Sequence, residues 1–495
     1  MVTMDTSYSA QVRAQRDVSQ RGPLFVLPLF ILAGVIFVAK VVQQSATNTA
    51  ILFVFAAALG VYLCQKTAHD LKDHRLVCLS YFWLAKLAVS LFLLYAGWMP
   101  MVSPDTPVIS GYDPIRYYYY SQELIDSGWR PDSFNLNYMG VLYYYGAIFA
   151  LFGRNPVTPA LINSLLTLFL SLYLVKTAYE IKPERHRNDW LIGLVLLMPE
   201  LLWYDVITSR ETVTSFFLLV PLISAGRYLA KTAAVSLLNV VVALMASTIA
   251  IAALRTSMLL PFSLSMLLML AFLRRRNLRR SGIQRAVLLF LGVAAIVVGP
   301  IITRQLGGYE FDLGEIFHVT VSASRNVAAS ADMSWSDQSI GMLLLPEGVA
   351  QSILFVFPRM LLYLIAPLPY VFAPFQSAYG YIDWQSMMTL LSSIVNVFMF
   401  PMLIASFYYA LRGRLNNSAP LMFHIIFWPS MLAIAGGNLI IHERYRIMAT
   451  PVLWGAVWLG FQMPYKRWRT RLTIIWYGVL TTASAFYVAY KFYYR

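Results

Sequence analysis

The chain has 495 residues, of which 59% are hydrophobic and only 12% are charged. Soluble domains average about 45–50% apolar and about 25% charged residues, so a soluble core of this size does not absorb the excess. The composition excludes a soluble enzyme, a nucleic-acid-binding domain and a disordered scaffold, and it predicts a polytopic membrane protein. The formal net charge of +15 therefore needs a reason other than a soluble acidic partner.

Apolar runs long enough to cross about 30 Å of hydrocarbon recur along the whole chain. They predict an all-α polytopic membrane protein with about 13 transmembrane helices. The runs lie at 24–42, 50–65, 77–97, 157–179, 189–207, 212–230, 234–253, 257–273, 286–303, 385–410, 418–437, 446–463 and 472–490.

The basic residues orient these spans. With the N-terminus in the cytoplasm, the cytoplasmic pieces contain 24 of the 38 Lys and Arg residues, and 274–285 alone contains six. This is the pattern of the positive-inside rule, so anionic membrane lipid is the expected partner of that charge, and no nucleic acid is expected. Cys64 and Cys78 flank a cytoplasmic loop and predict no disulfide.

The remaining residues are concentrated in two outer segments. Each contains an apolar stretch that is too short or too rich in proline to be a simple span, at 140–153 and 343–375, and both are expected to form interfacial or re-entrant helices. The predicted organisation is 1–97 for the N-terminal spans, 98–156 for the first outer loop, 157–303 for the central bundle, 304–384 for the second outer loop and 385–495 for the C-terminal bundle.

The first outer loop contains the acid–base candidates. A carboxylate just outside the bilayer, near apolar surface, can keep its pKa high enough to act as a general base on a hydroxyl. Asp113 is the first choice and Asp105 the second. The alternative for Asp113 is a helix cap, because Pro114 is typical of the first position of a helix.

Two tyrosine runs, at 117–120 and 143–145, follow Asp113. They are typical of an interfacial aromatic belt, and the alternative is a surface on which sugars stack.

Three segments carry a recognisable pattern in a fixed order. The first outer loop reads GYDPIRYYYYSQELIDSG and then NYMGVLYYYGAIFALFG, the second segment is PELLWYDVITSRETVTSFFLLV at 199–220, and the third is ERYRIMATPVLWGAVWLG at 443–460. Together they resemble the GT-C superfamily of integral membrane glycosyltransferases. The matching positions in the first loop are Asp113, Tyr117, the tyrosines at 143–145, Phe152 and Gly153. The chain departs from many members in having three predicted spans, not one, before this loop.

The resemblance implies transfer of a sugar from a polyprenyl-phosphate-linked donor to a lipid, glycan or protein acceptor on the outer face of the membrane. Asp113 would then remove the acceptor proton, and arginines would stabilise the departing lipid phosphate. Arg444 and Arg446 are the first candidates for the phosphate, with headgroup snorkelling as their alternative. The further substrate-binding candidates are Arg210, Glu211, Arg255 and Tyr117, and Arg210 and Glu211 could instead pair with each other.

No cofactor is expected, since no His, Cys or carboxylate cluster has metal-ligand spacing, although a divalent cation stays possible. Four acidic residues of the second outer loop could bind such an ion or an acceptor, or form a solvated loop: Asp312, Glu315, Asp332 and Asp337. Lys86 and Glu200 lie within predicted spans, where ionisable groups are functional candidates or pair inside the bundle.

Two other functions remain open: an O-antigen-type polymerase that transfers a whole undecaprenyl-linked oligosaccharide, and a flippase or transporter of such lipids. The expected location is the bacterial inner membrane, with the active side periplasmic or extracellular.

Overall fold

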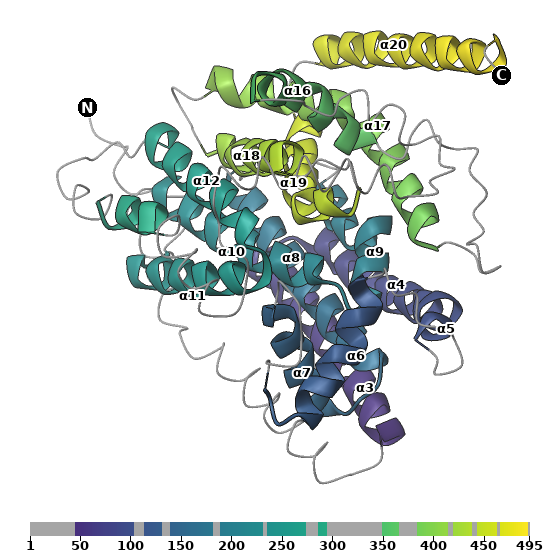
Figure 1. Ribbon diagram of the computed structural model, residues 1–495. Helices are drawn as coiled ribbons and strands as arrows, with labels where there is room; N and C mark the ends of the chain where they lie inside the picture. Colours follow the sequence, from purple (N-terminus) through teal and green to yellow (C-terminus); the bar gives the residue numbers. More distant parts are fainter. Residues whose placement is uncertain are drawn as a thin grey trace, which may run out of the picture.

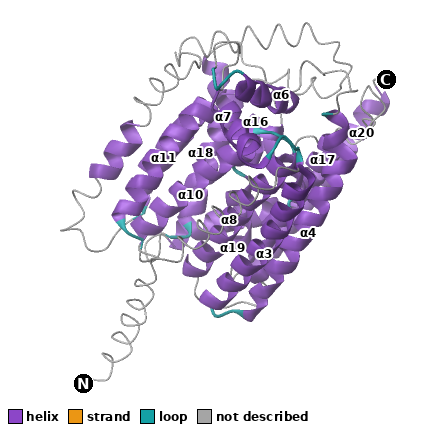
Figure 2. Cartoon of the chain, turned by 90° about the horizontal axis from the view of Figure 1, so that it is seen from below, coloured by secondary structure: helices purple, strands orange, loops and turns teal. Residues whose placement is uncertain are grey.

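The computed structural model describes residues 45–102, 113–130, 139–181, 189–230, 235–273, 286–294, 349–365, 384–413, 419–437, 443–462 and 466–493. These residues form helices joined by turns, with no strand among them (Figure 2). The helices are α3 (Ser45–Asp70), η2 (His74–Val77), α4 (Cys78–Leu93), η3 (Leu94–Trp98), α5 (Met99–Met101), α6 (Asp113–Asp126), α7 (Met139–Phe152), α8 (Val157–Ile181), η5 (Asp189–Leu197), α9 (Pro199–Val206), α10 (Arg210–Ala230), α11 (Leu237–Arg255), η6 (Thr256–Met258), α12 (Leu259–Phe272), α16 (Val349–Ile365), α17 (Trp384–Gly413), α18 (Leu421–Gly437), η7 (Glu443–Met448), α19 (Thr450–Phe461) and α20 (Lys466–Tyr493).

Within the described ranges, six helices are long and apolar enough to cross a membrane, as expected of an integral membrane protein. They are Thr49–Asp70, His74–Met101, Val157–Ile181, Arg210–Ala230, Leu237–Phe272 and Met387–Arg412. Each coincides with one of the predicted spans, except that Leu237–Phe272 contains two of them. That stretch breaks at Arg255, whose φ of −165° and ψ of 88° are not helical, so it forms two helices, α11 and α12.

The other predicted spans take different forms. The run at 189–207 divides into the 3-10 helix η5 and the short helix α9, because Pro199 begins a new helix at its first position. The runs at 418–437 and 446–463 contain the shorter apolar helices α18 and α19. The run at 472–490 lies in α20, which is not among the six. The run at 24–42 lies outside the described residues, and of the run at 286–303 only the helical segment 286–294 is described, so the count of 13 stays a prediction.

One end of the helices is covered by α6, and we call it the α6 end (Figure 2). The Tyr119 hydroxyl of α6 donates to the carbonyl of Val102, which follows α5, at 3.0 Å. At the opposite end, Arg227 of α10 donates to Glu180 of α8 at 2.7 Å. The helix α20 lies apart from most of the other helices and contacts α17 (Figure 1).

The amphipathic helix α6 ends in a well-defined turn. The Trp129 N–H donates to Leu124 O at 2.8 Å and the Gly128 N–H to Ile125 O at 3.1 Å, which is the pairing of a Schellman cap. Gly128 has a φ of +68°, which only glycine adopts at little cost. The Trp129 ring then stacks on Tyr143 of α7 with the two planes 5° apart. The predicted helix at 140–153 is therefore a 14-residue helix that packs on α6.

The charged pair Asp126–Arg154 gives a pH prediction at this end of α6. Arg154 Nη1 donates to Asp126 Oδ2 at 2.9 Å, and this hydrogen bond, with the arginine charge, holds the pKa of the carboxyl below its ordinary value. A depressed folded-state pKa stabilises the fold above the unfolded pKa of about 3.9, and that contribution is lost as the pH falls through the lowered value. We expect the melting temperature of the wild-type protein in detergent to fall slightly more below about pH 4 than that of Arg154→Gln. Parallel pH curves would contradict this.

A close helix contact gives a stability prediction. A Cβ atom on Gly460 of α19 would overlap the backbone carbonyl of Met402 in α17, which cannot rotate away. Gly460→Ala is therefore expected to lower the free energy of unfolding by about 1–3 kcal/mol, measured by thermal unfolding in detergent. The matched control is Gly478→Ala in α20, where the new Cβ meets nothing within 4 Å and the helix should gain about 0.5–1 kcal/mol. Equal effects of the two changes would show that α17 and α19 do not touch there.

Candidate functional site

Buried charges gather around α9 and the start of α10. Burying an ion is costly unless it is paired and hydrogen-bonded, so a dense group of such residues needs a specific arrangement to be stable. Seven charged residues, each at most 6% exposed, belong to this group: Lys86, Glu200, Asp205, Arg210, Glu211, Arg255 and Arg446.

The turn at 207–209, between α9 and α10, connects this group to the start of α6. The Thr208 hydroxyl donates to the Pro114 carbonyl at 2.5 Å, one residue after Asp113. The Tyr145 hydroxyl of α7 donates to the carbonyl of Ser209 at 2.5 Å. Asp113 therefore begins its helix beside the turn that leads into Arg210.

Side chains from neighbouring helices satisfy the backbone carbonyls of this turn. The Asn163 amide of α8 donates to Asp205 O at 3.3 Å and to Ile207 O at 3.5 Å. The same amide donates to the Tyr145 hydroxyl at 3.1 Å, and its oxygen accepts from Tyr144 at 3.0 Å. Since non-helical carbonyls inside a bundle need partners, these side chains determine where the turn can lie.

Asp205 lies in the last turn of α9, just before the turn at 207–209, and binds side chains of three other helices. Its carboxylate accepts from the Lys86 ammonium at 2.6 Å, from the Thr167 hydroxyl at 2.9 Å and from the Thr212 hydroxyl at 2.8 Å. These donors come from α4, α8 and α10. Together these three donors give both oxygens of the buried carboxylate a hydrogen-bond partner.

Arg255 lies at the break between α11 and α12 and faces two groups from elsewhere. Its Nη1 is 3.7 Å from Glu211 Oε1, and its guanidinium carbon is 4.2 Å from the centre of the Tyr445 ring. Glu211 follows Arg210 at the start of α10, and Tyr445 belongs to η7.

Arg446 has a different environment from Arg255. Its Nε donates to Glu200 Oε2 at 2.7 Å, its Nη1 to the carbonyls of Tyr363 and Leu364 at 3.1 and 3.4 Å, and its Nη2 to Thr389 O at 3.0 Å. The side chain is 1% exposed. Arg446 thus joins η7 to α9, α16 and α17, and it satisfies carbonyls in the last turn of α16.

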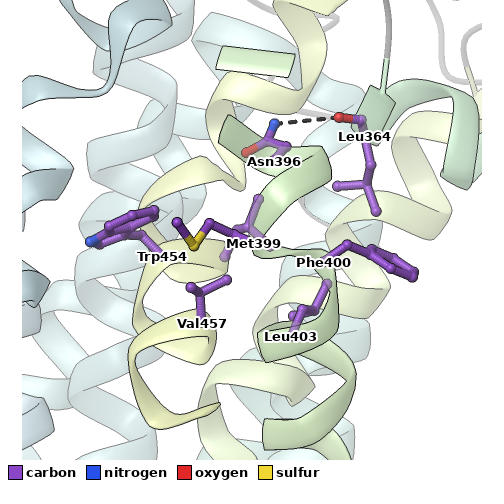
Figure 3. A pocket seen from close by; sticks show the side chains of 8 residues that line it. Leu364, Asn396, Met399, Phe400, Leu403, Trp454 and Val457 are labelled. Carbon is purple, nitrogen blue, oxygen red and sulfur yellow. Dashed lines mark hydrogen bonds between the residues drawn. The ribbon is translucent and has the colours of Figure 1, made fainter. Parts of the chain in front are cut away.

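An apolar pocket lies next to Arg446, between α16, α17 and α19 (Figure 3). The Asn396 amide on its wall donates to the Leu364 carbonyl at 3.4 Å, the same carbonyl that Arg446 reaches. The other lining side chains include Met399, Phe400 and Trp454, which offer no group for acid–base chemistry.

The structure brings most of the sequence-predicted residues into one region. Asp113 is half-buried and is the first residue of α6. Tyr117 is buried one turn further along the same helix. Asp105 and the acidic residues of the second outer loop lie outside the described residues. Arg444 lies in η7, and its side chain is also outside the described part.

The tyrosine run at 143–145 contains residues with different surroundings. Tyr145 is fully buried and Tyr144 binds Asn163, so these two hydroxyls organise the turn at 207–209. Of the three tyrosines, only Tyr143 stacks on the exposed ring of Trp129.

Sequence reasoning missed Asp205 together with its partners Asn163, Thr167 and Thr212. The signal that singled out Lys86 and Glu200, an ionisable residue inside an apolar run, applies equally to Asp205 in 189–207. The polar partners carry no such signal, because Asn and Thr are common in apolar helices.

No group of three or more His, Cys, Asp or Glu side chains that could hold a metal ion occurs in the ranges that the structure describes. The sequence matches no protein-family model, and no curated protein or solved structure matches it either.

Proposed function

We propose that this chain is an integral membrane glycosyltransferase that moves a sugar from a polyprenyl-phosphate-linked donor to an acceptor on the outer face of a bacterial inner membrane. One observation carries the proposal. The start of α6 with Asp113, the start of α10 with Arg210 and Glu211, the break at Arg255 and η7 come from distant parts of the chain. A hydrogen bond from Thr208 to Pro114, an ion pair between Arg255 and Glu211 and a contact of Arg255 with the Tyr445 ring link them in one region.

Asp113 is the proposed general base. A carboxylate at the start of a helix, half-buried and beside the turn that leads into Arg210, can take the proton of an acceptor hydroxyl as the new glycosidic bond forms. The proton moves to the carboxylate, the hydroxyl oxygen attacks the anomeric carbon, and the bond from that carbon to the lipid phosphate breaks.

Arg210 and Arg255 are the proposed ligands of the departing phosphate. Guanidinium groups bind phosphate oxygens through two hydrogen bonds, and Arg255 is held by a ring face and a carboxylate, which orients its plane. Arg446 makes four hydrogen bonds to protein groups, so we assign it to holding the frame of the site.

The test uses a pair of short lipids that differ only in the phosphate, farnesyl phosphate and farnesol. We expect farnesyl phosphate to raise the melting temperature of the purified protein in detergent, and farnesol to leave it unchanged, because a ligand stabilises the state that binds it. Arg255→Gln should remove the shift. The matched control is Arg154→Gln, a change in an exposed arginine beside α6, which should keep it.

Equal stabilisation by farnesyl phosphate and farnesol would show that the tail alone binds, and it would contradict a phosphate site. A shift that survives in Arg255→Gln would remove Arg255 from it.

A further inference from the structure

The Lys86–Asp205 pair lies below the proposed phosphate site and takes no part in the proposed chemistry. Both side chains are fully buried. Replacing such a pair by apolar groups is often neutral or stabilising, so a buried pair is weak evidence for a stability role. The contacts of the pair bear instead on where the neighbouring helices lie.

Three helices meet at the Asp205 carboxylate. The ammonium of Lys86 comes from α4, and the two hydroxyls come from Thr167 of α8 and Thr212 of α10. Thr212 lies two residues after Arg210 and one residue after Glu211, in the first turn of the same helix. A shift of Asp205 therefore moves the first turn of α10 directly.

The same residue also fixes the turn from its backbone side. The Asp205 carbonyl accepts from Asn163, whose amide also contacts Ile207 O. The chain then reaches Thr208, which binds the Pro114 carbonyl at the start of α6. A continuous set of contacts therefore links Asp205 to the start of α6, which carries Asp113, and to the start of α10, which carries Arg210.

We propose that Lys86 and Asp205 are positioning residues that hold the start of α10 and the start of α6 in the geometry that the phosphate site needs. This inference rests on the proposed function for its binding readout. The Lys86 ammonium and two hydroxyls, from three different helices, bind the two oxygens of one carboxylate. These directional contacts fix the positions of the three helices along one another, whereas an apolar contact would allow the helices to slide.

The chain contains a matched control for a purely structural role. Arg227 of α10 donates to Glu180 of α8 at 2.7 Å, at the opposite end of the same two helices, and both side chains are largely buried. The double variants Lys86→Gln/Asp205→Asn and Glu180→Gln/Arg227→Gln each remove one buried pair and leave the net charge unchanged.

The first measurement is the dissociation constant for farnesyl phosphate of both double variants at a temperature where both are folded. We expect the Lys86/Asp205 variant to bind at least about tenfold more weakly, a loss of about 1.4 kcal/mol, and the Glu180/Arg227 variant to bind within about twofold of the wild type. Equal losses in both variants would overturn the proposal, because they would follow from stability alone.

The second measurement needs no ligand. Hydrogen exchange, read by mass spectrometry, is expected to rise in peptides covering 205–212 and 113–118 for the Lys86/Asp205 variant and to stay at wild-type levels there for the Glu180/Arg227 variant. Unchanged exchange in both segments would overturn the proposal. A wild-type protein that binds no farnesyl phosphate would count against the proposed function, and this exchange comparison would still decide the positioning role.

A milder pair of variants covers the case in which the double variant does not fold. Thr212→Val keeps the shape and removes the hydroxyl that donates to Asp205, and Thr212→Ser keeps the hydroxyl. We expect Val to weaken farnesyl phosphate binding and Ser to restore it. Equal binding by the two variants would show that the hydrogen bond to Asp205 does not position the site.

Discussion

Replacing Glu200 with glutamine is expected to lower the free energy of unfolding by about 3–5 kcal/mol, the cost of leaving a buried charge without its partner. Arg446 would keep its charge inside the bundle while losing the carboxylate that binds its Nε at 2.7 Å. The Thr450 hydroxyl, which donates to the other Glu200 oxygen, would also lose a charged acceptor. The measurement is the thermal or denaturant midpoint of the purified protein in detergent.

The control for this prediction removes both charges. Glu200→Gln with Arg446→Met removes both charges of this pair, so most of the lost stability should return, even though the carbonyls of Tyr363 and Thr389 lose their donor. A double variant that is less stable than Glu200→Gln alone would show that those carbonyl contacts matter more than the ion pair.

Replacing Asp113 with asparagine is expected to reduce sugar transfer by about 10²–10⁴-fold, the usual contribution of a general base. Asparagine is similar in size and also caps helices, so the start of α6 should keep its position. The measurement is accumulation of the sugar-loaded polyprenyl lipid, read by mass spectrometry, in cells whose own copy is replaced by the variant. Binding of farnesyl phosphate should stay close to that of the wild type.

The matched control for Asp113 is Asp126→Asn, at the other end of the same helix. Asp126 is exposed and pairs with Arg154, so its loss should leave transfer intact. Normal transfer by Asp113→Asn would assign that residue to capping. A protein that moves the lipid across vesicles without forming a glycosidic bond would be a flippase, and Asp113→Asn would then have no special effect.

Sequence periodicity and composition predicted the long helices well, because about 20 apolar residues in a row have few other stable structures. The predicted run at 157–179 and the helix Val157–Ile181 agree within two residues at each end. The division of 189–207 into two helices has a local cause. Pro199 lacks the backbone N–H that a continuous helix needs at this position. The average hydrophobicity of the run changes little with one such residue, so it does not reveal the interruption.

The site was predictable only in part, for a related reason. Asp113 is recognisable as a carboxylate in an outer loop near apolar surface. Arg210, Glu211 and Arg255 are recognisable as charges between apolar runs. The sequence alone does not show which buried charges form pairs in the folded chain. Arg446 is, with Arg444, a first candidate for the phosphate from sequence, and in the structure its donors are directed at Glu200 and three carbonyls. Those contacts join residues more than 50 positions apart.

The separation of the buried partners along the chain has a consequence for how the protein is made. Lys86 and Asp205 are 119 residues apart, so the ribosome needs roughly 6–24 s to supply the aspartate after the lysine, at about 5–20 residues per second. Through that interval α4 must enter the bilayer with an unmatched ammonium, which costs about 2.5–3.5 kcal/mol on the insertion scale. The apolar remainder of His74–Met101 has to offset that cost alone. The timing of synthesis, as well as the final contacts, therefore constrains which residues α4 can contain.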